Sequence, residues 1–240
     1  MPKFLMPSSV PVICPWIVPQ APAELLALFG AEPETESFPP RHGLQSDVRE
    51  TRTIRRVDAG LLSQGVTNFL LNKPLAMNLY PAGTMPGFLN LFTGVPTPRV
   101  LKTITASTVT TMPKDAYRER LSADRELLIR YAEYAELASK SELIGMEALF
   151  TLPLADRALL WFASALLYEG VNPLDVTDET VPVAIPITRA ALANIIYTSK
   201  GPLDRLMAEF FRTETLVRTD AGMRVRVRAL RPMAEWVLTH

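Results

Sequence analysis

The 240-residue sequence predicts an α+β fold in which a β-rich region, one long helix and a helical unit with a β hairpin follow one another. Three observations support this order. Short segments rich in Val, Ile, Leu and Thr, separated by Gly, Pro and Asn, fill residues 38–113. Residues 114–150 contain no proline, which favours helix. Beyond residue 187, a two-helix pattern precedes a strict alternation of apolar and basic residues.

The composition restricts the function classes. With 48% hydrophobic and 21% charged residues, the chain can form one large domain or two modest ones. Lys plus Arg equals Asp plus Glu at 25 each, so the whole-chain charge does not point to nucleic acid. From Ile187 onward, however, nine basic residues face five acidic ones, as a DNA-binding module would require. The single cysteine, Cys14, excludes an internal disulfide, a Cys-rich zinc site and an iron–sulfur cluster on several thiolates.

The N-terminal region has nine prolines among the first 40 residues. We therefore expect an extended arm over residues 1–37, interrupted by one short helix around "AELLALFG". The apolar run "VPVICPWIVP" is short and broken by prolines, so it makes a poor signal peptide and cannot span a bilayer as a helix. The sequence thus predicts a cytoplasmic protein with no membrane partner.

The β-rich region extends over residues 38–121. Its strand-like segments are "VRETRTIRRVDAG", "LLSQGVTNFLLN", "LAMNLYPAG" and "RVLKTITASTVTTMP". Their spacing predicts a compact antiparallel domain, a roll or a barrel.

The long helix is expected over residues 122–150, with Ser122 as N-cap ahead of Asp124 and Glu126. A narrow apolar stripe recurs along it at spacings of four, three and four, formed by Leu127, Tyr131, Tyr134 and Ala138. Such a stripe is typical of a helix that pairs with another helix, which predicts a dimer. The alternative is that the stripe packs on the β domain of its own chain.

The C-terminal domain is expected over residues 151–240 and begins with the apolar helix "LADRALLWFASALLYEG", followed by the acidic connector "VNPLDVTDETVPVAIP". The stretch "ITRAALANIIYTSKGPLDRLMAEFF" predicts two helices joined by a tight corner. Ser199 is a good N-cap for the second helix, and Pro202 falls in its first turn, where a missing N–H is tolerated.

The tail "TLVRTDAGMRVRVRAL" has a turn signal at Asp220, Ala221 and Gly222. After it, Met223, Val225 and Val227 alternate with Arg224, Arg226 and Arg228. This alternation predicts a hairpin with one apolar and one basic face. A helix–turn–helix followed by such a hairpin is a winged helix.

In this order of parts, the sequence from about residue 22 to 230 resembles the CRP/FNR family of bacterial transcription regulators. The segments "LPLADRALLWFASALL" and "ITRAALANIIYTSKGPLDRL" are similar to its hinge helix and its DNA-binding motif, and "FPPRHGL" and "QGVTNFLL" to two of its strands. "SKSELIG" also resembles the IprA-like branch. The resemblance implies a β-roll (cyclic-nucleotide-binding-like) domain, a long dimerisation helix and a winged helix-turn-helix domain. It further implies a homodimer that reads a pseudo-palindromic operator in double-stranded DNA.

The resemblance assigns the base-reading positions to Lys200, Gly201 and Arg205. Candidates for phosphate contacts are Thr188, Arg189, Thr198, Ser199, Arg224 and Arg226. Two departures predict a different target sequence: Tyr197 stands where the family commonly has a corner glycine, and Gly201 where it has a glutamate that reads cytosine. The alternative for the three arginines of the hairpin is a solvated face without partners.

The segment "GFLNLFTGVPTPRVLKTITAS" resembles the family's phosphate-binding cassette, which has the form Gly-Glu-x-Gly followed later by Arg-Ser. The matching residues here are Gly87, Phe88, Leu89, Asn90, Pro98 and Arg99. A phenylalanine cannot accept the ribose hydrogen bond of a cyclic nucleotide, so we expect a degenerate site. Arg99 could still meet an anion, although a lone arginine is also an ordinary surface residue. The degenerate domain would bind an apolar ligand or a protein, or serve dimerisation alone.

Cofactors and catalysis are not expected. Only His42 and His240 could offer an axial haem ligand, and neither histidine accompanies a nucleophile or a metal-ligand cluster. The sequence therefore predicts a non-enzymatic regulator that is not controlled by cyclic nucleotide and whose effector is unidentified. Its partners would be DNA, a second copy of the chain and RNA polymerase. The alternative function is a protein-interaction module in which the winged helix and β-roll dock protein partners.

Overall fold

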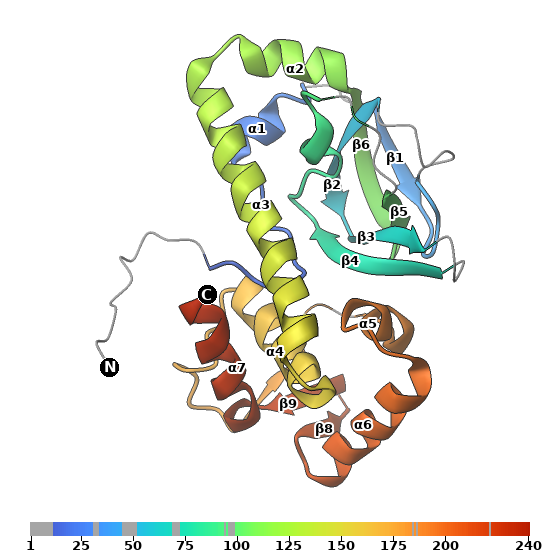
Figure 1. Cartoon of the computed structure of the whole chain (residues 1–240), viewed down its shortest axis with the longest axis vertical. Coiled ribbons are helices and arrows are strands. Elements are labelled where there is room, and N and C mark those ends of the chain that lie inside the picture. Colours follow the sequence, from blue (N-terminus) through green and yellow to red (C-terminus); the bar gives the residue numbers. More distant parts are fainter. Residues whose placement is uncertain are drawn as a thin grey trace.

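The computed structural model consists of a β-rich half and a helical half joined by one long helix (Figure 1). It describes residues 12–30, 34–44, 52–68, 73–93, 95, 99–183, 185, 187–220 and 222–240. Pro98 of the expected cassette and Ala221 of the expected turn lie outside these residues. The α+β class predicted from the sequence is confirmed.

The β-rich half is a roll of two three-stranded antiparallel sheets. One sheet has the order β1-β6-β2, with bounds Thr35–Phe38, Ser107–Pro113 and Thr53–Ala59. The other has the order β4-β3-β5, with bounds Lys73–Pro81, Leu61–Asn68 and Arg99–Thr103. In the second sheet Leu62 stands opposite both Tyr80 and Thr103, which fixes the faces of all three strands. A short 3₁₀ helix, η1 (Phe88–Asn90), follows β4.

The N-terminal arm packs between β4 and the long helix. The backbone N–H of Val18 donates to the carbonyl of Leu79 at 3.0 Å, and the N–H of Leu79 donates to the carbonyl of Trp16 at 2.7 Å. The hydroxyl of Ser141 donates to the carbonyls of Cys14 and Ile17. Trp16 and Ile17 are buried, so this segment is part of the core. Helix α1 (Ala23–Ala27) follows it.

Two helices follow the roll, α2 (Lys114–Ser122) and the long α3 (Arg125–Thr151). Ser122 is the last residue of α2, so the predicted N-cap was wrong. Asp124 caps α3 instead, because its side chain accepts a hydrogen bond from the N–H of Glu126.

The apolar stripe of α3 packs on the roll of its own chain. Tyr131, Tyr134 and Ala138 are buried in the same core as the strands, and Leu127 packs against that core. The hydroxyl of Tyr131 donates to the carbonyl of Phe88, and that of Tyr134 accepts from the N–H of Met85 at 3.0 Å. The assignment of this stripe to a dimer contact was therefore wrong, because the tyrosine hydroxyls find their partners inside the roll.

The helical half begins with α4 (Leu154–Tyr168) and contains α5 (Arg189–Ile195) and α6 (Lys200–Arg212). Its sheet has the order β7-β9-β8, with bounds Thr180–Pro182, Gly222–Arg226 and Leu216–Thr219. The predicted alternation ends at Arg226, because Val227 and Arg228 already belong to α7 (Val227–Thr239). This helix buries one apolar face, formed by Val227, Leu230, Ala234 and Val237, in the core shared with α4.

One apolar core connects the two halves. It runs from Trp16, Leu61 and Leu79 at the base of the roll, through α4, into the helix pair and β9. In Figure 1, α5 lies directly below β4, in agreement with the contacts between these two elements. Within the described residues, no helix is long and apolar enough to cross a membrane.

Candidate nucleic-acid interface

The helix pair α5–α6 forms around a tight corner. The N–H of Thr198 donates to the carbonyl of Ala193 at 2.8 Å, which folds the chain back on α5. Tyr197 takes a left-handed backbone with φ 52° at this corner, and its side chain is 55% exposed. The family glycine that Tyr197 replaces would take this conformation without strain. The corner is thus formed despite the tyrosine.

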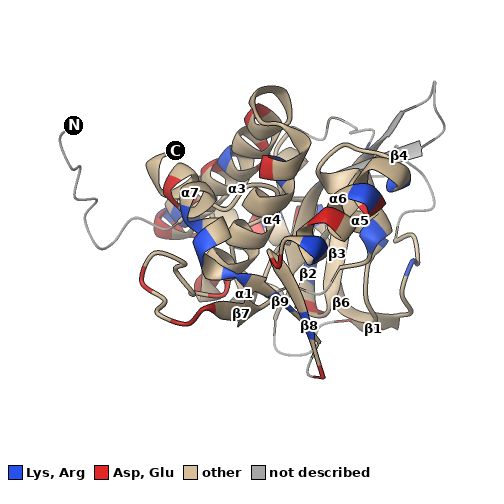
Figure 2. Ribbon diagram, turned by 90° about the horizontal axis from the view of Figure 1, so that it is seen from below, with Lys and Arg blue, Asp and Glu red and all other residues tan. Residues whose placement is uncertain are grey.

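The beginning of α6 presents the three predicted base-reading positions to solvent. Lys200, Gly201 and Arg205 are exposed, while Leu203 and Met207 on the other side of the helix are buried. Lys200 and Arg205 form no ion pair within the described part of the chain, so both cations are available to a partner. Figure 2 shows this end of the molecule, with basic ribbon segments on α5 and α6.

The hydroxyl residues around the helix pair lie at helix starts. Thr188 caps α5 and accepts from the N–H of Ala191 at 3.2 Å, and its hydroxyl hydrogen stays free to donate. Ser199 occupies the N-cap position of α6 but its side chain makes no capping hydrogen bond. Thr188 and Ser199 are exposed and Thr198 is half-buried. Thr198 and Ser199 precede α6 directly, whereas Thr188 lies at the start of α5.

Arg189 is engaged by a neighbour. Its Nη1 lies 2.9 Å from Oδ1 of Asp204, which joins the start of α5 to the first turns of α6. Both side chains are partly exposed, so water screens this pair and it is worth little as a stabilising contact. Arg189 can therefore exchange Asp204 for a phosphate at small cost.

Arg224 and Arg226 both have hydrogen-bond partners inside the domain, and their assignment as phosphate contacts stays a prediction. Arg224 donates to the hydroxyl and the carbonyl of Thr180 on β7. Arg226 is only 13% exposed and pairs with both Glu179 and Glu214. The reason is that β9 is the central strand, and the acidic connector before α5 returns as β7 along its edge.

The residue that sequence reasoning missed on the wing is Arg218 of β8. It is exposed, its guanidinium lies 4.8 Å from the centroid of the Phe211 ring, and it has no acidic partner among the described residues. A groove of about 740 Å³ separates α6 from the wing, and Arg189 and Arg218 line it together with acidic Asp204 and Glu214. The sequence contains Arg218 in the run "TLVRTD", but only the fold shows that, among the described arginines of the wing strands, it is the one without an acidic or hydrogen-bonded partner.

The cassette-like segment of the roll is filled by its own side chains. The ring of Phe88 is buried and lies 5.3 Å from that of Tyr134. Asn90 is buried too; it accepts from Lys114 and donates to the carbonyl of Val95. Gly87 takes φ 95°, and a β-carbon there would lie 3.0 Å from the carbonyl oxygen of Thr53. Phe88 and Asn90, two of the residues that match the nucleotide-binding positions, are thus core residues.

Arg99 lies apart from these residues, on β5, where it pairs with Glu142 of α3. No group of His, Cys, Asp and Glu side chains in the described ranges could hold a metal ion. Burial raises the pKa of the Cys14 thiol to about 12, so it is an unreactive core residue.

Comparisons with known proteins bear on the fold. No protein-family model and no curated protein matches the sequence. Among solved structures, FixK2 from Bradyrhizobium japonicum superposes with a TM-score of 0.69 at 10% identity, covering 85% of this chain and 97% of that one.

Two further structures agree with this result. The c-di-GMP responsive global regulator CLP of Xanthomonas campestris gives a TM-score of 0.68 at 15% identity, over 85% of this chain and 99% of that one. TTHA1359, a CRP/FNR-family transcriptional regulator from Thermus thermophilus, gives a TM-score of 0.60 at 21% identity. The superposition covers 84% of this chain and 98% of that one. The chain therefore has the fold of the CRP/FNR transcription regulators, as its sequence predicted.

Proposed function

We propose that the protein is a sequence-specific DNA-binding transcription regulator that acts as a homodimer on a pseudo-palindromic operator. The observation that carries the proposal is the exposed, unpaired cationic start of α6, with Lys200 and Arg205 on either side of Gly201. A helix N-terminus with two such cations suits the major groove, where Arg and Lys donate to guanine. Such a regulator works in the cytoplasm and is not an enzyme.

The phosphate contacts in this proposal come from the helix starts and the wing. Thr188, Thr198 and Ser199 offer hydroxyls beside α6, and Arg189 and Arg218 offer charge on the two sides of the groove. Arg218 adds to Arg224 and Arg226 an exposed cation of the wing that has no acidic partner among the described residues. These contacts set affinity and salt dependence rather than sequence preference.

The test is a selection of bound sequences from genomic DNA, followed by shift assays with the preferred sequence. We expect Lys200→Ala and Arg205→Ala each to weaken this complex about 5- to 150-fold while non-specific binding changes less. Arg212→Ala is the control, because Arg212 lies at the far end of the same helix and pairs with Glu209. Unchanged sequence preference in the double variant of Lys200 and Arg205 would refute the proposal.

The dimer in this proposal uses the solvent-facing side of α3 rather than its tyrosine stripe. Exposed apolar residues there include Ile129, Leu143, Met146 and Phe150, which is 84% exposed. Together with Ala132, Glu136 and Ser139 they follow the alternating spacing of three and four that is typical of a helix paired with its own copy. A second copy of α3 would cover this face.

Sedimentation tests the dimer. We expect the wild-type chain to sediment as a dimer and Leu143→Glu to sediment as a folded monomer, because pairing would bury the new carboxylate beside the apolar Met146 and Phe150. Tyr131→Glu should instead unfold the roll, since that position is buried. A monomeric wild-type protein would contradict the assignment.

Cyclic nucleotide does not control the regulator in this proposal, because Phe88 fills the place of the ribose-binding carboxylate and Arg99 already has a counter-ion. RNA polymerase is its expected protein partner. The rival function, docking of a protein by the winged helix, predicts that shift assays find no sequence preference at any salt concentration.

A further inference from the structure

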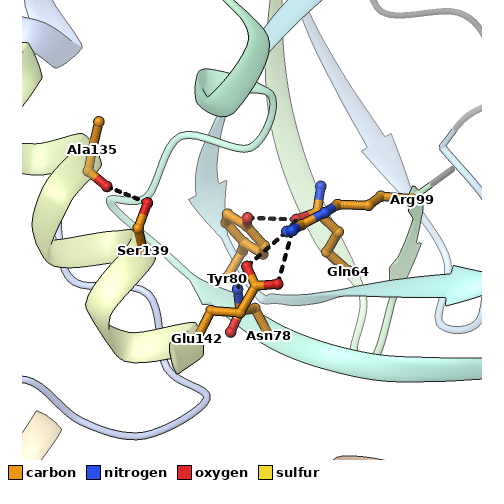
Figure 3. Close-up of polar contacts among 7 residues, drawn as sticks. All are labelled: Gln64, Asn78, Tyr80, Arg99, Ala135, Ser139 and Glu142. Atoms are coloured by element: carbon orange, nitrogen blue, oxygen red, sulfur yellow. Dashed lines mark hydrogen bonds and ion pairs between the residues drawn. The ribbon is translucent and has the colours of Figure 1, made fainter. Parts of the chain in front are cut away.

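A polar cluster lies between the second sheet of the roll and the middle of α3 (Figure 3). Its centre is a two-pronged ion pair: Nη1 of Arg99 lies 2.7 Å from Oε2 of Glu142, and Nη2 lies 2.8 Å from Oε1. The side chains are only 20% and 11% exposed. A guanidinium paired in this way with both oxygens of a carboxylate is held in direction as well as in distance.

Side chains of the sheet orient Arg99 and Glu142. The side-chain oxygen of Gln64 accepts from Nη1 of Arg99 at 3.3 Å and from the hydroxyl of Tyr80 at 2.8 Å. The amide of Asn78 donates to Oε2 of Glu142 at 3.1 Å. Gln64, Asn78 and Tyr80 are all buried.

These groups share one face of one sheet. Gln64 of β3 stands directly opposite Asn78 of β4, and Tyr80 follows Asn78 by two residues, on the same face. Arg99 is the first residue of the neighbouring β5. The donors therefore belong to β4 and β5, whereas the carboxylate that they bind comes from α3.

We propose that this face of the sheet is a binding site for a carboxylate or phosphate group, and that Glu142 is its built-in occupant. A buried arginine needs a counter-charge, and carboxylate and phosphate are the two groups that match its fork. Because the chain supplies the anion itself, α3 is held on the roll without an external effector. This regulatory consequence rests on the proposed function, whereas the site itself does not.

The built-in anion also positions the dimer face. Leu143 follows Glu142 directly and points to solvent, since it is 62% exposed. Pairing Glu142 with Arg99 therefore fixes the rotation of α3 about its own axis at the place where the second copy would pack. A protein with Glu142 in place would bind DNA at the same affinity with or without a small anion.

Chemical rescue of Glu142→Ala tests the site in the full-length protein. The variant should have a lower Tm than wild type, because Arg99 loses its counter-charge. Inorganic phosphate or acetate, at constant ionic strength set with NaCl, should raise its Tm saturably by about 2–4 °C. The two anions in separate titrations tell whether the site prefers phosphate or carboxylate.

Further proteins make the result specific. Wild type should show no saturable shift, nor should Glu133→Ala, which removes an exposed carboxylate of the same helix that pairs with Arg130. The double variant Arg99→Gln/Glu142→Ala should lose the rescue. Glu142→Ser, whose side chain is also short enough to leave room for the anion, serves in place of the alanine variant if that one does not fold. Equal shifts in wild type and variant, or rescue that persists without Arg99, would overturn the site.

DNA binding separates this inference from the proposed function. We expect Glu142→Ala to bind its operator more weakly than wild type and to recover when the rescuing anion is added, while the wild-type affinity does not change. If rescue of Tm occurs but the wild type binds no DNA, the site stands and the proposed function fails. If the wild type binds DNA and no rescue occurs, the anion site fails alone.

Discussion

Lys114 at the start of α2 is a cation with only 6% of its surface exposed. Its ammonium donates to the side-chain oxygen of Asn90, one of the residues that match the nucleotide-binding cassette. Burial, and after it the nearby positive charge of Arg55, lower the pKa of Lys114 to about 8. The folded state thus releases a proton that the unfolded chain keeps up to its ordinary 10.5.

This difference sets the sign of a pH dependence. Above about pH 8 the unfolded chain binds more protons at this lysine than the folded chain, so the free energy of unfolding should rise with pH. The rise in the free energy of unfolding ends near pH 10, because tyrosines then ionise in the unfolded chain. In the folded chain, burial raises the pKa of Tyr117 and Tyr131 above the ordinary value, so they stay protonated. Stability is lost as they ionise on unfolding.

Urea denaturation between pH 7 and about pH 11 measures the effect. We expect Lys114→Met to flatten the rise, because the buried charge is gone, and to leave the loss above pH 10 unchanged. A rise of the same size in the variant would show that another group causes it.

At the scale of elements, the contact between the arm and α3 depends on Gly145. A β-carbon at this position would lie 2.6 Å from Cδ1 and 2.7 Å from Nε1 of Trp16, well inside van der Waals contact. Trp16 is buried and cannot move aside freely. Gly145→Ala should therefore lower the free energy of unfolding by about 1–2 kcal/mol, even though alanine favours helix.

Gly43→Ala is the matched control, because its β-carbon would meet nothing within 4 Å and its backbone is not left-handed. We expect the free energy of unfolding of that variant, measured by urea denaturation, to equal the wild-type value within about 0.5 kcal/mol. Equal stability of the two variants would mean that the arm does not pack on α3 in solution.

The same helix shows what sequence alone can and cannot predict. The proline-free run and its acidic start predict a long helix, and the structure has one. The stripe of Leu127, Tyr131, Tyr134 and Ala138 is apolar by composition, but the sequence does not say which of two apolar faces meets the roll. The hydroxyls of Tyr131 and Tyr134 decide it, because their partners are backbone groups more than 40 residues away in the chain.

The partners of the charged residues in the wing could not be predicted from the sequence either. Alternation predicts a strand that ends with basic residues, and β9 is that strand. The partners of Arg224 and Arg226 include Thr180 and Glu179, 44 and 47 residues away, at the start of a short edge strand and directly before it. Both belong to a connector rich in proline and acidic residues. Local patterns carry no information on such long-range pairs, so the exposed cations could be identified only from the fold.

At the scale of the whole molecule, the shared core predicts that both halves unfold together. Trp16 is part of that core, with Leu61 and Leu79 of the roll on one side and α4 on the other. We expect calorimetry of the wild type to give one transition, with equal calorimetric and van't Hoff enthalpies. Trp16→Ala, which should cost about 3–5 kcal/mol, removes the largest side chain that the arm contributes to this core.

In Trp16→Ala, the stability that is lost should come from the contact between the two halves and not from either half itself. The roll keeps its second core around Leu62, Tyr80 and Val109. Two separate transitions are therefore expected. Trp236→Ala is the control, because Trp236 packs against the core from α7 and stacks on His240 but is not part of the arm, so its loss should lower Tm while leaving one transition. A single transition in Trp16→Ala would mean that contacts other than the arm, such as those between α5 and β4, are sufficient to couple the halves.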